Sequence, residues 1–462
     1  MGARCQRRVS RLPTPRANKV TSVDDQTTPD FSEALKVWWR IGLLSFGGPA
    51  AQIALMHREL VDQRRWLSER EFLDALGFCM LLPGPEAMQL ATVAGRRLHG
   101  WRGGLAAGLL FVLPGATVIL VLAALYTGFG QMPLVSALFV GIQAAVVVIV
   151  IQALIRVATR TLHTARYWLI AALAFIALFV FDLPFPLVIV CAGLIGGVTG
   201  SMTDTEPVDR VVSTPESQAT PDSQTTLGSQ PTLANTALTI LFWLLIWWLP
   251  LLLLLGLDTP LWFEIGQFFS TLATLTFGGA YAVLAWMVQD VVNTREWMTG
   301  PEMLDALGLA ETTPGPLILV TQFVGFVAGH RNGGFLYGLA AAGITLWATF
   351  IPCFLWVFAG APWLDRISAN PRLRGVLSAI TAAVVGVMLN LSLWFALHVF
   401  FADVSRSSLG AVGAWLPDLA TWRPWSVLLS LIAAFLVFRL HWSLLRLLPV
   451  MACAGLVVGA IV

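Results

Sequence analysis

Long apolar runs without charge dominate the chain. No Asp, Glu, Lys or Arg occurs in Gly103–Ile155, and the same holds for Ala237–Leu257, Gly333–Leu364 and Gly375–Ala402. A helix needs about 20 apolar residues to span a bilayer. Buried helices of soluble proteins rarely run so long without charge, and apolar–polar alternation typical of a membrane barrel is missing. The pattern predicts an all-α polytopic membrane protein.

Two polar segments interrupt this pattern. Residues 1–30 are rich in Arg, Thr and Pro and are expected to form a disordered tail; no apolar core follows the early arginines, so the tail does not read as a secretory signal. Its basic residues favour a cytoplasmic N-terminus. Residues 201–235 are rich in Ser, Thr, Pro and Gln and are expected to be a flexible linker. It divides the chain into apolar halves, 31–200 and 236–462.

The two halves repeat. Shifting the second half by 231 positions aligns Phe46–Pro85 with Phe277–Pro316 without a gap, with eighteen identities in forty positions. The identities include Gly, Pro, Trp and acidic residues in register, which chance matching of apolar residues does not produce. The segments are therefore copies of one unit.

Thirteen spans are expected, six in the first half and seven in the second. The expected spans lie near 32–57, 71–95, 103–127, 134–155, 167–181, 185–200, 237–257, 261–289, 303–328, 333–358, 376–401, 424–438 and 442–461. Span 237–257 has no counterpart in the first half, so the second repeat is predicted to lie upside down, as in many secondary transporters. The arginine-rich loop 58–70 would then lie outside, against the positive-inside rule, unless its flanking segments re-enter the membrane.

Composition supports a membrane protein and excludes several classes. The chain of 462 residues is 57% hydrophobic and 12% charged, about half the usual charge of soluble proteins. A net charge of +2 does not suggest nucleic-acid binding. The five Cys and six His show no metal-binding spacing and no disulfide framework. We therefore expect no metal and no cofactor.

Each half carries two breaks inside apolar segments. The first is Phe-Gly-Gly, at 46–48 and 277–279, and the second is Pro-Gly-Pro, at 83–85 and 314–316. Two prolines around a glycine stop a helix. Broken backbone in a membrane needs protein or a watery cavity around it. Matching breaks in two halves therefore indicate a transport site, although isolated Gly and Pro in membrane helices are more often packing kinks.

The breaks suit an anion. A broken helix offers a half-helix N-terminus whose N–H groups and dipole favour compact oxyanions without any Lys or Arg in the membrane. The expected substrate-binding residues are Phe46, Gly47, Gly48, Pro83, Gly84, Pro85, Gln89, Phe277, Gly278, Gly279, Thr312, Thr313, Pro314, Gly315, Pro316 and Gln322.

Two acidic residues beside the breaks are candidate proton sites. Glu86 follows Pro85, and Glu311 lies three residues before Pro314. A carboxylate there would repel an anion, and protonation would remove that repulsion; a surface-facing or Arg-paired carboxylate is the alternative. Asp74 and Asp305, in the repeated Leu-Asp-Ala-Leu-Gly, are interpreted as helix-end or interhelical structure.

These residues resemble the chromate ion transporter family in its long, two-domain form. Phe-Gly-Gly-Pro at 46–49, Leu-Leu-Pro-Gly-Pro-Glu-Ala at 81–87 and Glu-Thr-Thr-Pro-Gly-Pro-Leu at 311–317 carry the resemblance, which covers nearly all of 31–462. It implies a multi-pass protein of the bacterial inner membrane that exports chromate and confers chromate resistance, with its halves in opposite orientation and sulfate as a competing dianion.

The function expected first is therefore chromate export by a secondary transporter, with proton-coupled uptake of sulfate or another oxyanion as the alternative. A membrane enzyme is disfavoured because no Walker, dinucleotide-binding or haem motif occurs, and a gated anion channel is a third class. Expected partners are chromate, sulfate and membrane lipids, with a homodimer left open and no nucleic acid.

Overall fold

The computed structural model describes residues 29–130, 132–203, 232–256, 259–277, 280–363, 371–409 and 412–461. The predicted tail lies outside the described residues except for its last two positions. The predicted linker does so over 204–231, while short stretches at its two ends belong to helices.

In the first half, the described residues form helices joined by short loops, with no strand among them. Its elements in chain order are α1 (Phe31–Leu44), α2 (Gly48–His57), the π-helix η1 (Arg58–Gln63), α3 (Glu69–Cys79), α4 (Glu86–Phe129), α5 (Pro133–Thr161), α6 (Ala165–Phe179) and α7 (Phe185–Thr203).

The second half repeats this order after one added helix. Its elements are α8 (Leu233–Leu253), η2 (Leu254–Gly256), α9 (Pro260–Thr274), α10 (Ala280–Gln289), η3 (Asp290–Thr294), α11 (Gly300–Thr312), η4 (Leu317–Leu319), α12 (Val320–Gly360), η5 (Ala361–Trp363), α14 (Pro371–Phe400), β1 (Val404–Leu409), β2 (Val412–Pro417), η6 (Leu419–Thr421), α15 (Pro424–Ala434), η7 (Phe435–Arg439) and α16 (Leu444–Ile461).

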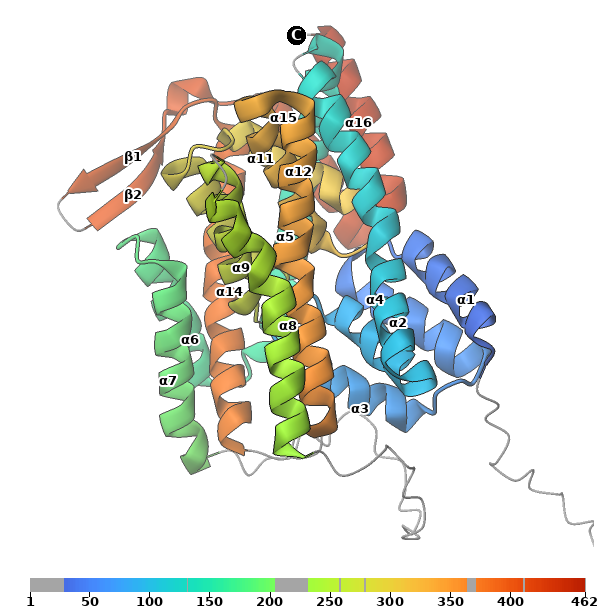
Figure 1. The fold of residues 1–462 in the computed structure, drawn as a ribbon. Helices are drawn as coiled ribbons and strands as arrows, with labels where there is room; N and C mark the ends of the chain where they lie inside the picture. The colour runs from blue at the N-terminus through green and yellow to red at the C-terminus, as the bar shows by residue number, and fades with distance from the viewer. Residues whose placement is uncertain are drawn as a thin grey trace, which may run out of the picture.

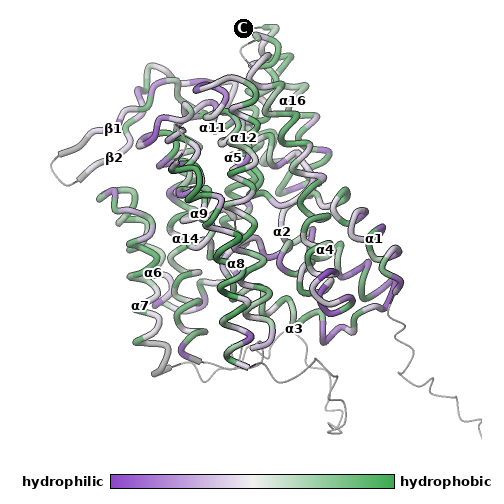
Figure 2. Tube along the Cα trace, in the orientation of Figure 1, coloured by the Kyte–Doolittle hydropathy of each residue, from purple (hydrophilic) through white to green (hydrophobic). Residues whose placement is uncertain are grey.

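The chain is a multi-pass, predominantly α-helical membrane protein. Six helical segments of the described residues are long and apolar enough to cross a bilayer: Glu86–Phe129, Pro133–Thr161, Leu233–Gly256, Leu317–Trp363, Gly375–Phe400 and Leu444–Ile461. Figure 2 shows hydrophobic residues along these helices and more polar ones where α2 leads to α3. Many large apolar side chains are exposed, such as Leu134 and Leu194, at 66% each, as lipid contact requires. The count of thirteen crossings stays a prediction.

The labels α4 and α12 each cover two helices joined by a sharp reversal. Gly100 has φ +60° and Gly334 has φ +79°, a left-handed conformation inside each labelled segment. The arms then pack closely, since a Cβ placed on Gly103 would lie 2.2 Å from the carbonyl oxygen of Gly95. Glycine on both sides lets the two backbones touch. The shorter arm of each hairpin begins beside a Pro-Gly-Pro break.

The sequence repeat recurs in the hydrogen bonds. Ser68 with Glu71 and Thr299 with Glu302 form capping boxes at the starts of α3 and α11. Before each box lies a π-helical turn closed by an Arg–acid pair, Arg64 with Glu59 and Arg295 with Asp290. All these positions differ by 231. The arginines of loop 58–70 thus include one that is paired with a buried acid.

Each half packs its last pair of helices against a helix of the other half. The last pair of the first half, α6 and α7, packs against α14 of the second half, and α15 and α16 pack against α5 of the first. Figure 1 shows α6 and α7 beside α14 at one side of the molecule and α16 at the other side. α12 also packs against α4. Neither half therefore has a complete core of its own.

A small β-hairpin was not predicted. Strands β1 and β2 pair antiparallel, from Val404 opposite Pro417 to Leu409 opposite Val412. Arg406 pairs with Asp182 of the α6–α7 turn at 2.5 Å, and the Gly413 N–H donates to the Val180 carbonyl. The hairpin therefore fastens the α6–α7 pair to the connection between α14 and α15.

Candidate functional site

The Phe-Gly-Gly break of the first half separates α1 from α2. α1 ends at Leu44, and Gly47 and Gly48 follow with φ of +88° and +78°. Residues other than glycine rarely adopt this left-handed region. At 14 and 10 residues, α1 and α2 are each too short to cross a bilayer. The predicted break is confirmed here as a break in the helix; in the second half, Gly278 and Gly279 lie outside the described residues.

Both Pro-Gly-Pro segments also interrupt helices. α3 ends at Cys79 and α4 begins at Glu86, while α11 ends at Thr312 and η4 begins at Leu317. The central glycines, Gly84 and Gly315, have φ of +118° and +91°. The chain therefore turns at each Pro-Gly-Pro through a conformation that the glycine permits.

The breaks of the two halves meet through a crossed pair of hydrogen bonds. The Gly84 N–H donates to the carbonyl of Thr276, and the Gly315 N–H donates to the carbonyl of Ser45, both at 2.8 Å. Each Pro-Gly-Pro thus binds the residue just before the Phe-Gly-Gly of the other half. Both donors and both acceptors differ by 231 positions, so the two bonds are equivalent under the repeat.

Ser45 and Thr276, whose carbonyls accept these bonds, each donate a side-chain hydrogen bond back to their own helix. Ser45 Oγ donates to the carbonyl of Ile41 at 2.5 Å, and Thr276 Oγ1 donates to the carbonyl of Leu272 at 2.6 Å. Both hydroxyls are buried and return to their own helix. Buried polar groups need such partners, because an unpaired one is costly away from water.

Two buried glutamines brace the breaks. Gln52 Nε2 donates to the carbonyl of Gly315 at 2.7 Å, across the halves, and Gln89 Nε2 donates to the carbonyl of Pro83 at 2.6 Å. The Oε1 atoms of both side chains, and of Gln322, are buried and have no hydrogen-bond partner among the described residues. Amide oxygens of this kind can accept from a water or from a protonated ligand.

The backbone crossing is tightly packed. A Cβ on Gly115 of α4 would lie 2.2 Å from the carbonyl oxygen of Pro314, and a Cβ on Gly84 would lie 2.9 Å from Cys353 Sγ of α12. The second, long arms of both hairpins therefore lie against the opposite break. Glycine is needed at Gly115 because the approach is to backbone, which cannot move aside as a side chain can.

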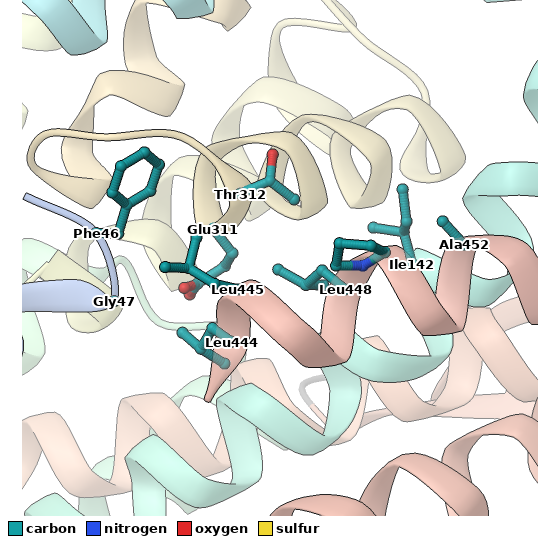
Figure 3. A pocket seen from close by; sticks show the side chains of 10 residues that line it. Phe46, Gly47, Ile142, Glu311, Thr312, Leu444, Leu445, Leu448 and Ala452 are labelled. Atoms are coloured by element: carbon teal, nitrogen blue, oxygen red, sulfur yellow. The ribbon is translucent and has the colours of Figure 1, made fainter. Parts of the chain in front are cut away.

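A cavity of about 190 Å³ opens beside one half of this crossing. Phe46 and Gly47 of the first break and Glu311 and Thr312 at the end of α11 line it (Figure 3). The other lining residues are apolar, come from α5 and α16, and are Ile142, Leu444, Leu445, Leu448, Pro449 and Ala452. Figure 3 shows the Glu311 carboxylate directed toward Leu444 and Leu445. The space exceeds what one water needs.

Helices that begin at the crossing start without a side-chain cap, unlike α3 and α11. No side chain caps the starts of α2, α4 or η4, whereas Ser68 and Thr299 cap the starts of α3 and α11. The first N–H groups of a helix have no intrahelical partner. The inner starts thus present amides and positive dipole ends toward the breaks.

The other predicted residues are distributed around the crossing. Glu86 begins α4 and does not line the cavity. Four threonine hydroxyls donate back to carbonyls of their own segment, those of Thr92, Thr312, Thr313 and Thr321. Phe277 follows Thr276 directly, while Pro85 and Pro316 precede the helix starts. The two repeated aspartates differ: Asp74 is exposed, and Asp305 is buried at 8% exposure.

Sequence reasoning missed several residues of this region. Gln52 lies one turn after the first break, a signal that was visible as an isolated amide in an apolar helix. Ser45 and Thr276 are matched small polar residues directly before Phe-Gly-Gly, which the repeat could have shown. The apolar cavity wall from α16 gave no signal, since it resembles any other membrane-facing stretch.

The described residues provide no cluster of metal-ligating side chains at this site. Within the described ranges, no group of three or more His, Cys, Asp or Glu side chains is placed to hold a metal ion. Nearby arginines are bound elsewhere: Arg96 donates to the carbonyls of Val357 and Phe358, and Arg97 to that of Glu71. Backbone amides at the inner helix ends contribute positive potential at the crossing.

Comparison with known proteins identifies similar sequences over most of the chain. The profile of a family described as chromate transporter matches residues 32–197 and 263–460. The chromate transport protein of Pseudomonas aeruginosa is 29% identical over 382 residues, covering 81% of this chain and 83% of that protein. The probable chromate transport protein of Synechococcus elongatus is 28% identical over 353 residues, covering 76% and 80%.

A more distant relative carries no assigned substrate. An uncharacterised transporter of Methanocaldococcus jannaschii is 23% identical over 390 residues, covering 84% of this chain and 90% of that protein. No solved structure matches the chain.

Proposed function

Because the chain belongs to the chromate transporter family, we propose that it is a secondary transporter that exports chromate across the bacterial inner membrane and so confers chromate resistance. The observation that supports this most is the crossed pair of bonds, Gly84 to Thr276 and Gly315 to Ser45. It brings the matched breaks of two halves to one place, and such convergence is where transporters built from repeats bind substrate.

In this proposal the anion binds to the uncapped inner helix ends. The amides of Gly84 and Gly315 are already used between the halves, so the donors are the first-turn amides of α2, α4 and η4. Gly47 and Gly48 let the backbone approach closely, and the unpartnered Oε1 atoms of Gln89 and Gln322 can accept from a protonated oxyanion or from its water. Amides bind an oxyanion without a counter-cation, which keeps fixed charge out of the bilayer.

Glu311 is proposed as the carboxyl that senses the anion. It lines the cavity beside Phe46 and Gly47, where an ionised carboxylate repels a dianion and a protonated one donates a hydrogen bond to it. Glu86, at the start of α4, is a second candidate from the other half. The two are not equivalent under the repeat, because Met80 and Leu317 occupy the matching positions.

The proposal places the halves in opposite orientation, with α8 as the added crossing between them. The thirteen-span topology follows from that arrangement and puts the N-terminus in the cytoplasm. The exchange of α6 and α7 for α15 and α16 is the kind of packing that a two-fold relation produces. Single cysteines introduced into the turns between helices and mapped for accessibility from the two faces of the membrane test the orientation.

Export fits the membrane potential. Moving one charge across the membrane is worth about 2.3 kcal/mol per 100 mV, so a dianion leaving a negative interior gains about twice that. No ATP is needed. Uptake of sulfate would run against the same field and would require coupled cations.

Everted vesicles test the function. Labelled chromate and sulfate are followed while a valinomycin–potassium gradient sets the potential in either direction, with vesicles lacking the protein as the control. We expect chromate to enter everted vesicles when their lumen is positive, and cells with the protein to contain less chromate. Sulfate movement into intact cells, with chromate content unaffected, would overturn export, and flux at channel rates would replace the carrier mechanism.

A further inference from the structure

A second polar site lies next to the cavity, around Asp305 of α11. Tyr126 Oη of α4 donates to Asp305 Oδ2 at 2.8 Å, and Gln143 Nε2 of α5 donates to Asp305 Oδ1 at 2.7 Å. The aspartate is 8% exposed. Among the described residues no cation forms an ion pair with it. A buried carboxylate held by neutral donors alone is costly while it is charged.

The charged and titratable surroundings of Asp305 are few. Tyr126 faces it from α4, and Glu302 lies one turn earlier on its own helix. Glu302 is itself paired with Arg331 of α12, whose side chain is 41% exposed. From α5 comes the neutral Gln143. His398 of α14 lies against Gly300, at the start of α11 and five residues before Asp305, and α16 brings no titratable group of the described residues against Asp305.

Along α11, Asp305 lies between the Glu302–Arg331 pair and Thr312 of the cavity wall. The Glu302–Arg331 pair marks the end of α11 that water reaches, and Asp305 is three residues, about 4.5 Å, further along the helix. Thr312, which lines the cavity, is seven residues beyond Asp305 and therefore on the same side of α11. On α5, Gln143 directly follows Ile142, another lining residue. α5 and α11 thus each contribute to both the Asp305 hydrogen bonds and the cavity wall.

The repeat separates the burial of Asp305 from the fold of the single unit. The same Leu-Asp-Ala-Leu-Gly sequence contains Asp74 in the first half, where the aspartate is exposed. The first copy of the helix therefore forms without burying its carboxyl. The buried carboxyl at Asp305 joins α11 to α4 and α5 of the other half, a contact that the fold of the single unit does not require.

Resting on the proposed transport of chromate, we propose that Asp305 is a proton-binding site of the transport cycle, held by Tyr126 and Gln143. A proton from water adds to the carboxylate, forming one O–H bond and removing the charge. The same bond breaks when the proton leaves toward the other side. A metal cation does not suit the site, because both hydrogen-bond donors already point their hydrogens at the carboxylate oxygens.

Reconstituted full-length protein tests the proposal. Chromate accumulation in proteoliposomes is measured at a clamped potential, with and without an imposed gradient of one pH unit, and empty liposomes report leakage. With one proton coupled per chromate, the wild-type accumulation ratio changes about tenfold, because one pH unit is a tenfold difference in proton concentration. In D305N, which preserves the size of the side chain, we expect a ratio that no longer depends on pH and a KM for chromate that is unchanged.

The matched control is D74N, at the repeat-equivalent exposed position, which keeps the wild-type pH response. Chromate–chromate exchange at equal pH checks that D305N is folded, since exchange needs no net proton movement. If D305N does not reach the membrane, Tyr126→Phe serves instead. It keeps the carboxyl and is expected to move the pH midpoint of flux by about half a unit or more.

The outcomes separate the two proposals. D305N with a wild-type pH response, or Y126F with an unchanged midpoint, overturns the assignment of Asp305. Wild-type flux that ignores the pH gradient also overturns it while leaving chromate transport intact. No chromate movement by the wild-type protein overturns the proposed function itself.

Discussion

At the scale of single residues, glycine decides where the backbone can cross. Gly84 and Gly315 adopt positive φ at the centre of each Pro-Gly-Pro, and their N–H groups bind the opposite half. Gly115 lets α4 touch the Pro314 carbonyl. The prolines stop the helices, and the glycines allow the stopped ends to meet.

Replacing Gly84 with alanine should lower the chromate flux more than replacing Gly77 with alanine. A Cβ there would lie 2.9 Å from Cys353 Sγ and Gln89 Nε2, on a backbone with φ +118°. A left-handed conformation costs a residue other than glycine about 1–2 kcal/mol before any crowding. We expect chromate flux to fall about tenfold or more. Gly77→Ala is the control, because nothing lies within 4 Å of its Cβ position; equal loss in both variants would contradict the role of the crossing.

Glu311→Gln should alter how chromate affinity depends on pH. Glutamine has the shape of the protonated carboxyl and no charge beside the anion. We expect KM for chromate to fall at high pH and to lose its pH dependence, while the amount of protein in the membrane is unchanged. Initial rates over a range of pH and chromate concentration measure this. The matching variant E86Q shows whether the acid of the other half contributes, and wild-type KM profiles in both would remove these acids from the mechanism.

At the scale of elements, the glycine-lined hairpins within α4 and α12 position the breaks. The short arm of each begins at a Pro-Gly-Pro, and the long arm returns past it to contact the opposite break. Close backbone packing of the two arms is what sets the distance from each break to the other half. Van der Waals packing of small residues is the main source of helix association in lipid.

The Gly103→Val variant should therefore unfold at a lower temperature than the wild-type protein. The new side chain would meet the Gly95 carbonyl, only 2.2 Å from the Cβ position. Overpacking of this kind costs about 1–3 kcal/mol. Thermal unfolding in detergent measures the effect. Gly128→Val, in open space near the end of α4, is the control; a Tm equal to wild type for both variants would show that the arms separate easily.

The sequence predicted the breaks but not what they contact. Proline and glycine act on their own backbone, so the ends of α3 and α11 could be read locally. The Gly315 N–H donates to the Ser45 carbonyl, and Gln52 Nε2 donates to the Gly315 carbonyl. Both bonds depend on tertiary packing between the halves, so no local sequence pattern predicts them. Asp74 and Asp305 stand in identical motifs and differ in burial for the same reason. The β-hairpin was missed because its serine-rich first strand lacks an apolar face.

At the scale of the whole molecule, the halves are interlocked. α14 packs on the last helices of the first half, and α5 packs on those of the second. The crossed bonds then join the breaks at the centre. Neither half can change its arrangement at the site without moving residues of the other, which is the coupling that alternating access requires.

Covalent connection between the halves should be dispensable. If a protease site is placed between residues 204 and 231 and cut after purification, we expect the halves to copurify and chromate flux to stay within about twofold of the uncut protein, since apolar packing between helices holds them. Size-exclusion chromatography and flux before and after cleavage measure this. Either half produced alone should be inactive. Separation of the fragments in mild detergent would contradict the interlocked packing.

The exchanged helices also bear on ancestry. A polypeptide with only one such unit would leave its long central helix uncovered, and a second copy would supply the missing neighbours. Gene fusion then frees the two copies to diverge, and divergence is visible where Glu311 and Met80, or buried Asp305 and exposed Asp74, now stand at equivalent places. The repeat brings the breaks to one meeting point, and the proton site proposed at Asp305 uses a position at which the two copies differ.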